Sequence, residues 1–178
     1  MSNKQTTIIV SGFGGQGSLF CGKFLACIGM EKGQEVSWLP SYGPEMRGGT
    51  ARCGVVLSDT SIGSPLVTQP DILVAMNLPS FLAFEKDVKP GGTMFYDSSL
   101  LTQPHSRTDI TYRAVPASQM AVDNGLQGLA GMILAGGVLS LLPGVNESVI
   151  KAAMEQTVSE KKKELFESNI KAINLGMA

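Results

Sequence analysis

Short apolar runs alternate with amphipathic stretches along the first part of the chain. Residues 7–11 (TIIVS) are mostly β-branched and are followed by glycine, which predicts a buried strand. Residues 18–30 repeat large apolar side chains every four positions and predict a helix that ends near Gly33. Residues 35–39 (EVSWL) predict a second strand. A strand, a helix and a strand in this order form a βαβ unit with parallel strands.

The same alternation continues through the rest of the chain. Residues 126–142 are apolar all round and predict a buried helix. Another helix is predicted to begin at Asn146, a good N-cap residue, and to end among the lysines that follow. The pattern predicts an α/β fold with an open, doubly wound, mainly parallel sheet and helices on both faces. A short helix is also predicted at residues 79–87, and further strands are predicted at residues 50–57, 71–75, 93–96 and 110–115, the last at the sheet edge.

The composition bears on size and surface. The 178 residues suit a single domain, residues 1–178, which is long enough to bury a full core. Charged residues make up 16% of the chain, below the usual share of about a quarter. Nine methionines add adaptable apolar surface, and the cores of protein interfaces are poor in charge. This composition indicates either a chain that covers part of its surface with a partner or a well-packed monomer with a large core.

The charge and the apolar segments exclude several function classes. The net charge is −1, and the lysine run at residues 161–163 lies among acids on a predicted helix, so nucleic acid is not an expected partner. Residues 1–6 are polar and do not resemble a signal sequence. The apolar residues 126–142 contain several glycines and are shorter than a typical membrane span. We therefore expect a cytoplasmic protein without membrane contact.

Few residues in the sequence can carry chemistry. Cys21, Cys27 and Cys53 contain no CxxC pair, and His105 is the single histidine, so neither a zinc site nor an iron–sulfur site is expected. An odd number of cysteines indicates reduced thiols, and Cys53 lies inside a predicted buried strand. His105 lies in a polar stretch and is predicted at the surface. We expect no catalytic residue and no metal ligand. Roles as caps or turn formers are predicted for the aspartates that flank strands, Asp71 and Asp97.

Residues 12–17 (GFGGQG) match the GxGxxG pattern between a strand and a helix. Glycines permit a tight turn there, and the helix N-terminus offers unpaired N–H groups to an anion. A dinucleotide-binding fold usually adds an acidic residue near the end of the second strand, about 20 residues on. Here that strand ends in residues 37–40 (SWLP), without a carboxylate. Three interpretations stay open: a purely steric turn, a phosphate-binding loop, and a loop that presents backbone amides to a partner.

Residues 41–51 (SYGPEMRGGTA) follow the carboxyl end of the second strand, where open α/β sheets place their ligands. Tyr42, Glu45 and Arg47 bring together an aromatic ring, a carboxylate and a guanidinium. A guanidinium binds carboxylates and phosphates with its planar fork. The alternative is a local ion pair between Glu45 and Arg47, which is worth little at a surface. Gly48 and Gly49 favour close approach by another backbone.

The two motifs together resemble the gamma subunit of 2-oxoacid:ferredoxin oxidoreductases. The resemblance extends through residues 61–65 (SIGSP), 70–76 (PDILVAM) and 89–100 (KPGGTMFYDSSL) and into the helical C-terminal third. SYGPEMRGG is the more specific of the two motifs. It resembles the motif of the family branches that use 2-oxoglutarate, pyruvate or branched-chain oxoacids. Among these substrates, 2-oxoglutarate is favoured. The fold implied is the gamma-domain type of pyruvate–ferredoxin oxidoreductase.

The resemblance implies a non-redox subunit of a complex that oxidatively decarboxylates a 2-oxoacid to acyl-coenzyme A and passes electrons to ferredoxin or flavodoxin. The implied partners are alpha, beta and, where present, delta subunits, which carry thiamine diphosphate, Mg²⁺ and iron–sulfur clusters. The chain alone is expected to bind no cofactor and to be inactive, and homo-oligomers stay open when its partners are absent. The residues carried over as contacts to coenzyme A or to a partner subunit are Gly14, Gly15, Gln16 and Gly17 of the first motif and Tyr42, Glu45, Arg47, Gly48 and Gly49 of the second.

Two other functions stay open. The first is an NAD(P)-binding, Rossmann-type oxidoreductase domain, which the glycine motif supports and the missing ribose-binding acid opposes. The second is a non-enzymatic interaction module whose loops bind only protein. Titration with NADH distinguishes the first function from that of a gamma-type subunit. Co-purification with thiamine-binding subunits would favour a gamma-type subunit over the second.

Overall fold

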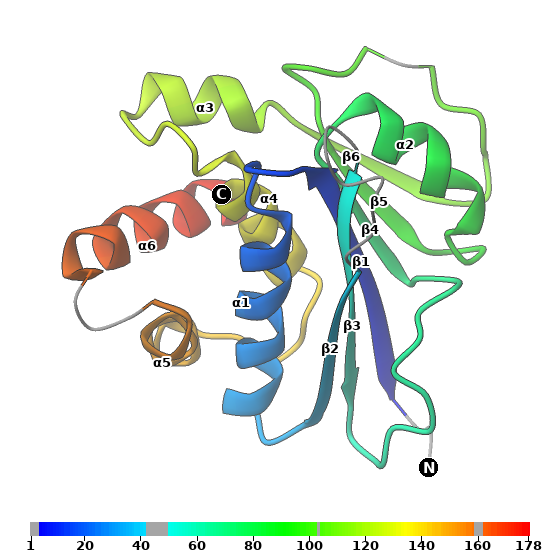
Figure 1. Cartoon of the computed structure of the whole chain (residues 1–178), viewed down its shortest axis with the longest axis horizontal. Helices are drawn as coiled ribbons and strands as arrows, with labels where there is room; N and C mark the ends of the chain where they lie inside the picture. The colour runs from blue at the N-terminus through cyan, green and yellow to red at the C-terminus, as the bar shows by residue number, and fades with distance from the viewer. Residues whose placement is uncertain (1–3, 42–49, 103, 159–161) are drawn as a thin grey trace.

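A computed structural model describes residues 4–41, 50–102, 104–158 and 162–178 of the chain. Its strands form one six-stranded sheet (Figure 1). In chain order they are β1 (Gln5–Phe13), β2 (Glu35–Ser41), β3 (Thr50–Ser58), β4 (Ile72–Ala75), β5 (Thr93–Asp97) and β6 (Thr111–Val115). Their order across the sheet is β2-β3-β1-β4-β5-β6, so the first strand of the chain lies near the centre.

The sheet is mainly parallel, as predicted. β1 pairs in parallel with β4, β4 with β5, and β5 with β6, which occupies the predicted edge. β3 pairs antiparallel with both β1 and β2, so these two strands of the βαβ unit run parallel with β3 between them. The insertion of β3 was not predicted. The short connection of residues 42–49 explains why β3 runs antiparallel to β2, since a parallel neighbour needs a crossover of a dozen or more residues.

β1 is buried on both faces. Residues 7–12 are all shielded from solvent. Alternate side chains of a strand point to opposite faces. Ile8 and Val10 accordingly join a large apolar cluster on one face, and Ile9 joins a smaller cluster on the other. A continuous apolar run is typical of a strand whose sheet is covered on both sides.

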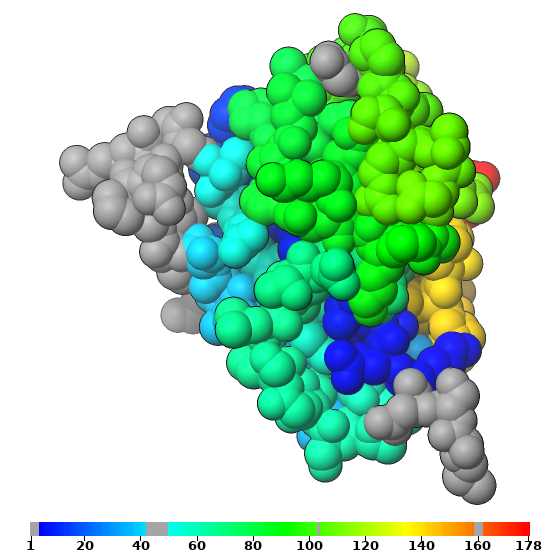
Figure 2. Space-filling view, turned by 90° about the vertical axis from the view of Figure 1, so that its right-hand side faces the viewer, coloured from blue at the N-terminus to red at the C-terminus, as the bar shows by residue number. Residues whose placement is uncertain are grey.

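Helices cover both faces of the sheet, which confirms the doubly wound arrangement (Figure 1). α2 (Leu78–Phe84) lies on the face of the smaller cluster and continues as a 3-10 turn at Glu85–Asp87. Figure 2 shows this face, with α2 in green and residues 59–70 beside it. The other helices gather on the face of the larger cluster: α1 (Ser18–Glu31), α3 (Ala117–Asp123), α4 (Ala130–Leu139), α5 (Glu147–Thr157) and α6 (Lys163–Met177).

The C-terminal helices differ in length from the prediction. The helix predicted at residues 126–142 is shorter, as α4, because Gly125 and Gly128 adopt left-handed φ angles of 67° and 85° before it. Asn146 caps α5 as predicted, since its Oδ1 accepts a hydrogen bond from the Val149 N–H (3.0 Å). A separate helix, α6, follows α5, and α3 was not predicted. Within the described ranges, no helix combines the length and apolar character needed to cross a membrane.

α4 and α6 pack with their backbones in contact. A β-carbon on Gly176 of α6 would overlap the carbonyl oxygen of Ile133, and one on Gly136 of α4 would overlap that of Ile173. α4 is buried along almost its whole length. Two glycines therefore bring α6 close enough to cover the outer side of α4.

Candidate functional site

The glycine motif forms the turn between β1 and α1. Gly15 and Gly17 adopt left-handed φ angles of 91° and 83°, and Gly17 is the residue before the first turn of α1. Other residues rarely adopt this conformation, so glycine is required at both positions. Gly14 and Gly15 are exposed, and a β-carbon on either would meet no atom within 4 Å. The backbone of the turn is therefore open to approach from outside.

The turn lies at the point where the chain connections change faces. β1 leads to α1 on the face of the larger cluster, whereas its parallel neighbour β4 leads to α2 on the opposite face. In open α/β sheets, ligands bind in the crevice that this divergence creates at the carboxyl ends of the strands. The fold thus places the turn at the expected position of a binding site.

Gln16 connects the glycine turn to the end of β4. Its Oε1 accepts hydrogen bonds from the Phe13 N–H (2.7 Å) and from Nδ2 of Asn77 (3.3 Å). Its Nε2 donates to the Met76 carbonyl oxygen (3.2 Å). Asn77 also caps α2, because its Oδ1 accepts from the Ser80 N–H (2.8 Å). Two turns that are 60 residues apart in sequence are therefore joined by side-chain amides.

A cleft of about 270 Å³ opens beside this network. It lies between the glycine turn, the ends of β4 and β5, and the first residues of α3 and α4. Main-chain groups of glycine form part of its wall. Its lining includes Gly15, Gln16, Met76, Asp97, Ser118, Gln127, Gly128 and Gly131.

Asp97 provides a buried carboxylate in this cleft. One oxygen, Oδ2, accepts hydrogen bonds from the N–H and the hydroxyl of Ser118 (3.0 and 2.5 Å). The other, Oδ1, accepts from the Ser99 N–H (3.0 Å). Of the two roles predicted for Asp97, the bond from Ser99 confirms that of a turn former, whereas the N-cap position of α3 is occupied by Pro116. The bonds of Asp97 fix the start of α3 against the end of β5.

The second motif falls outside the described residues: Tyr42, Glu45, Arg47, Gly48 and Gly49 are in the segment 42–49. The strands on either side of this segment are described. β2 ends at Ser41, and β3 begins at Thr50, whose partner in β1 is Phe13 at the start of the glycine turn. The contact between the two motifs stays a prediction, and the described strand end beside the turn is compatible with it.

The remaining candidates have structural roles. His105 is exposed, as predicted, and its ring stacks on that of Tyr112 with 3.8 Å between the ring centroids. All three cysteines are free and buried. Burial raises the pKa of the Cys21 thiol far above its ordinary value and that of Cys53 to about 11. These two thiols stay protonated and are therefore poor nucleophiles. The described ranges contain no group of three metal-ligating side chains.

The sheet order is unfavourable for a dinucleotide. Neighbouring strands lie about 4.8 Å apart, so the insertion of β3 moves β2 about 10 Å away from β1. A ribose-binding acid at the end of β2 would therefore lie about 4.8 Å farther from the glycine turn than in a fold in which β2 neighbours β1. The described end of β2, Leu39 to Ser41, carries no carboxylate. The geometry does not support the NAD(P)-binding alternative.

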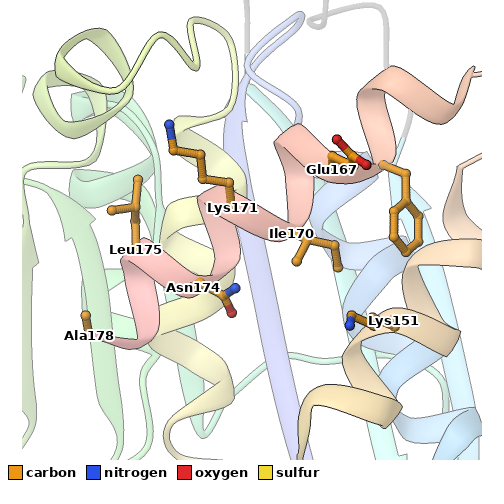
Figure 3. A pocket seen from close by; sticks show the side chains of 8 residues that line it. Lys151, Glu167, Ile170, Lys171, Asn174, Leu175 and Ala178 are labelled. Atoms are coloured by element: carbon orange, nitrogen blue, oxygen red, sulfur yellow. The ribbon is translucent and has the colours of Figure 1, made fainter.

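A second hollow, of about 600 Å³, lies between α5 and α6 (Figure 3). Apart from Lys151 of α5, its labelled residues lie along α6 or just after its end. Lys151 pairs with Glu147 at 2.6 Å on the exposed face of α5, and such surface pairs contribute little free energy. Among the described residues, those that line this hollow include no strand end and no residue of the glycine motif, so we place the candidate site at the glycine turn.

Asn77 and Asp97 are the residues of the site whose roles sequence reasoning underestimated. Asn77 was not singled out, although residues 77–80 (NLPS) after an apolar strand are typical of a capped helix start. The approach of Ser118 to Asp97 had no local signal, because 21 residues separate them. Gly14, Gly15, Gln16 and Gly17 were predicted as candidates, and the structure brings them together with these residues.

Comparison with protein families identifies the fold. Residues 7–178 match the family described as "Pyruvate ferredoxin/flavodoxin oxidoreductase". The ketoisovalerate oxidoreductase subunit VorA of Methanothermobacter thermautotrophicus is 38% identical over 97% of this chain, which spans only 36% of that protein. The 2-oxoglutarate synthase subunit KorC of Methanothermobacter marburgensis is 32% identical over 95% of this chain and 93% of its own length.

Two solved structures share the fold. The gamma subunit of a keto/oxoacid ferredoxin oxidoreductase from Geobacter sulfurreducens has a TM-score of 0.81 and 26% identity, covering 96% of this chain and 95% of that one. The 2-oxoglutarate:ferredoxin oxidoreductase of Magnetococcus marinus, with 2-oxoglutarate, coenzyme A and succinyl-CoA bound, has a TM-score of 0.84 and 26% identity. The match covers 98% of this chain and 30% of that one. The chain belongs to the pyruvate ferredoxin/flavodoxin oxidoreductase family.

Proposed function

We propose that this chain is the non-redox, gamma-type subunit of a complex that oxidatively decarboxylates a 2-oxoacid. The observation that carries the proposal is the match over nearly the whole chain to a separate subunit of similar length, KorC, and to a gamma subunit. In VorA and in the Magnetococcus enzyme, the matching region is about a third of a longer chain. The same domain therefore occurs both fused to other parts and as a separate polypeptide.

In the proposed reaction, the 2-oxoacid, coenzyme A and two oxidised ferredoxins give acyl-coenzyme A, carbon dioxide, a proton and two reduced ferredoxins. Thiamine diphosphate, Mg²⁺ and iron–sulfur clusters on alpha, beta and, where present, delta subunits supply the carbanion and electron chemistry; flavodoxin can replace ferredoxin. We propose that this chain supplies backbone and side-chain contacts at the rim of its sheet. The first-motif contacts are Gly14, Gly15, Gln16 and Gly17, and the second-motif contacts are Tyr42, Glu45, Arg47, Gly48 and Gly49.

The relatives support a 2-oxoacid as substrate and name two kinds. VorA is named for ketoisovalerate, a branched-chain oxoacid, and KorC for 2-oxoglutarate. We retain 2-oxoglutarate as the expected substrate, with branched-chain oxoacids and pyruvate as the alternatives. Activity of the assembled complex on each of the three compounds, at equal concentration, decides among them.

We further propose that residues 1–178 act as one domain in the cytoplasm. Its three free cysteines are compatible with a reducing compartment. Coenzyme A is the expected ligand near the glycine turn, because the Magnetococcus enzyme is described with coenzyme A bound and a helix N-terminus favours phosphate groups.

The test is assembly with the products of the neighbouring genes. The chain, carrying an affinity tag, is co-expressed with them and purified. We expect thiamine- and cluster-bearing subunits to co-purify, and the complex to reduce ferredoxin only when both a 2-oxoacid and coenzyme A are present. The chain alone is expected to show no turnover. An oxidoreductase of full activity that assembles without this chain would contradict the proposal.

Arg47 provides a sharper test of the second motif. We expect Arg47→Ala to raise the KM for coenzyme A, or to weaken assembly, by at least tenfold, because a bidentate guanidinium contact is lost. Arg113→Ala is the matched control, since it removes one guanidinium that is exposed on the edge strand β6. Equal behaviour of the two variants in both measurements would remove Arg47 from the site.

A further inference from the structure

We infer that Asn77 is a positioning residue that fixes the wall of the cleft through the side-chain amide of Gln16. The inference concerns the site of the proposed function and rests on it for its effect on coenzyme A. Its structural part concerns this chain alone. Asn77 is 3% exposed, lies two residues after the end of β4, and contacts Gln16 of the glycine turn.

The side chain of Asn77 has a hydrogen-bond donor that a helix cap does not need. Its Oδ1 caps α2 by accepting from the Ser80 N–H, and serine or aspartate would serve equally well there. An amide adds a donor, Nδ2, which reaches Oε1 of Gln16 at 3.3 Å. The second half of the side chain is thus used for a contact outside the helix.

The orientation of the Gln16 amide is determined by its partners. Oε1 must face the Phe13 N–H, a donor, and Nε2 must face the Met76 carbonyl oxygen, an acceptor. Rotation of the amide by 180° would oppose donor to donor and acceptor to acceptor, and would lose the bond from Asn77. Asn77 therefore favours the one orientation in which the glycine turn is closed onto β4.

Close packing leaves little room for another arrangement. A β-carbon on Gly12 would lie 2.9 Å from Oε1 of Gln16 and 3.0 Å from the β-carbon of Met76. Gln16 and Met76 both line the cleft, as does Gly15 of the turn. A shift of Gln16 would therefore change the shape of the cleft wall and the position of the exposed turn.

The structural test uses Asn77→Ser, which keeps the cap acceptor but is too short to reach Gln16. Hydrogen exchange of the Phe13 amide in the isolated chain reports the bond to Oε1 directly. We expect at least fivefold faster exchange in Asn77→Ser, and no further increase when it is added to Gln16→Ala, because both changes act on one bond. Asn146→Ser, at the N-cap of α5, is the matched control. Unchanged exchange, or additive effects in the double variant, would overturn the inference.

The functional test uses the assembled complex. We expect Asn77→Ser to raise the KM for coenzyme A about fivefold while kcat stays within twofold of the wild type. A lower kcat with an unchanged KM would contradict a role in positioning the cleft wall. Inactivity of a complex that contains the wild-type chain would instead contradict the proposed function. In that case, hydrogen exchange of the Phe13 amide in the isolated chain would be the measurement that decides whether Asn77 positions the turn.

Discussion

The α-carbon of Gly176 lies 3.0 Å from the point where a β-carbon on Gly136 would stand. This approach lets α6 cover α4, whose residues 131–139 are all buried. Helix axes normally lie 8–10 Å apart because side chains separate them, and only glycine on both helices removes that spacer. The contact joins the last helix to the helix that packs on β5.

Gly176→Ala is expected to destabilise the chain by about 2–3 kcal/mol, because the new methyl group would overlap the backbone of Ile133. The gain in helix propensity, about 1 kcal/mol, is smaller than this cost. Urea unfolding of the isolated chain measures the change. Gly63→Ala is the control, since a β-carbon there meets no atom within 4 Å and its φ is not left-handed. An equal midpoint for both variants would refute the close contact.

The three thiols are expected to be unreactive in the folded chain. Cys21 and Cys53 are fully buried and Cys27 is 6% exposed. Burial also raises the pKa of Cys53 to about 11, so almost no thiolate is present at pH 8. We expect a thiol reagent at pH 8 to label none of them within minutes, and all three after denaturation. Rapid labelling of one thiol under native conditions would contradict this burial.

Asp71 is expected to make stability depend on pH. Burial alone would raise its pKa, but hydrogen bonds from Lys89 (2.9 Å) and from the N–H and hydroxyl of Thr7 (both 2.8 Å) hold the pKa below its ordinary value. A lowered native pKa contributes stability at neutral pH that is lost as the pH falls through that pKa. The contribution is about 1 kcal/mol, because the carboxylate is partly exposed.

We therefore expect Asp71→Asn to cost about 1 kcal/mol at pH 7 and to cost less as the pH is lowered below the ordinary carboxyl range, because the wild-type carboxyl becomes protonated there. Chemical unfolding at a series of pH values measures both. Glu155→Gln, on the exposed face of α5, serves as the control. A constant difference between Asp71→Asn and wild type from pH 7 to the acid limit would exclude this linkage.

Gly14→Ala separates a structural turn from a binding turn. A β-carbon at Gly14 meets no atom within 4 Å and its φ is not left-handed, so stability should change by less than about 0.5 kcal/mol. In the assembled complex, however, we expect at least a fivefold loss of coenzyme A affinity or of assembly, because the methyl group obstructs close approach. Gly63→Ala is again the control. Normal behaviour of Gly14→Ala in the complex would favour the steric interpretation of the motif.

The sequence predicted which residues form strands better than it predicted which strands lie side by side in the sheet. Apolar runs marked β1, β4 and β5 because burial on both faces leaves a local pattern. The position of β3 between β1 and β2 depends on pairing between distant residues, such as Phe13 with Thr50, and leaves no such pattern. α3 was missed because its seven residues are too few to show a clear helical period.

Only part of the site could be predicted, because a local motif is visible in the sequence and a contact between distant residues is not. The glycine turn has a local motif, and the structure confirms its place between β1 and α1. The bond from Asn77 to Gln16 joins residues 61 positions apart and emerges only from the fold. Burial of Asp97 likewise follows from the docking of α3 rather than from its neighbours in sequence. The contribution of Arg47 stays a prediction that the variants above can decide.

The central place of β1 has a consequence for how the polypeptide is made. It leaves the ribosome before both of its neighbours, β3 and β4, so both of its edges are filled only after Ala75 has emerged. Until then, a strand with six consecutive buried positions presents open edges, which promote aggregation of nascent chains. A translation product that stops before Ile72 should therefore appear in the insoluble fraction or bound to chaperones.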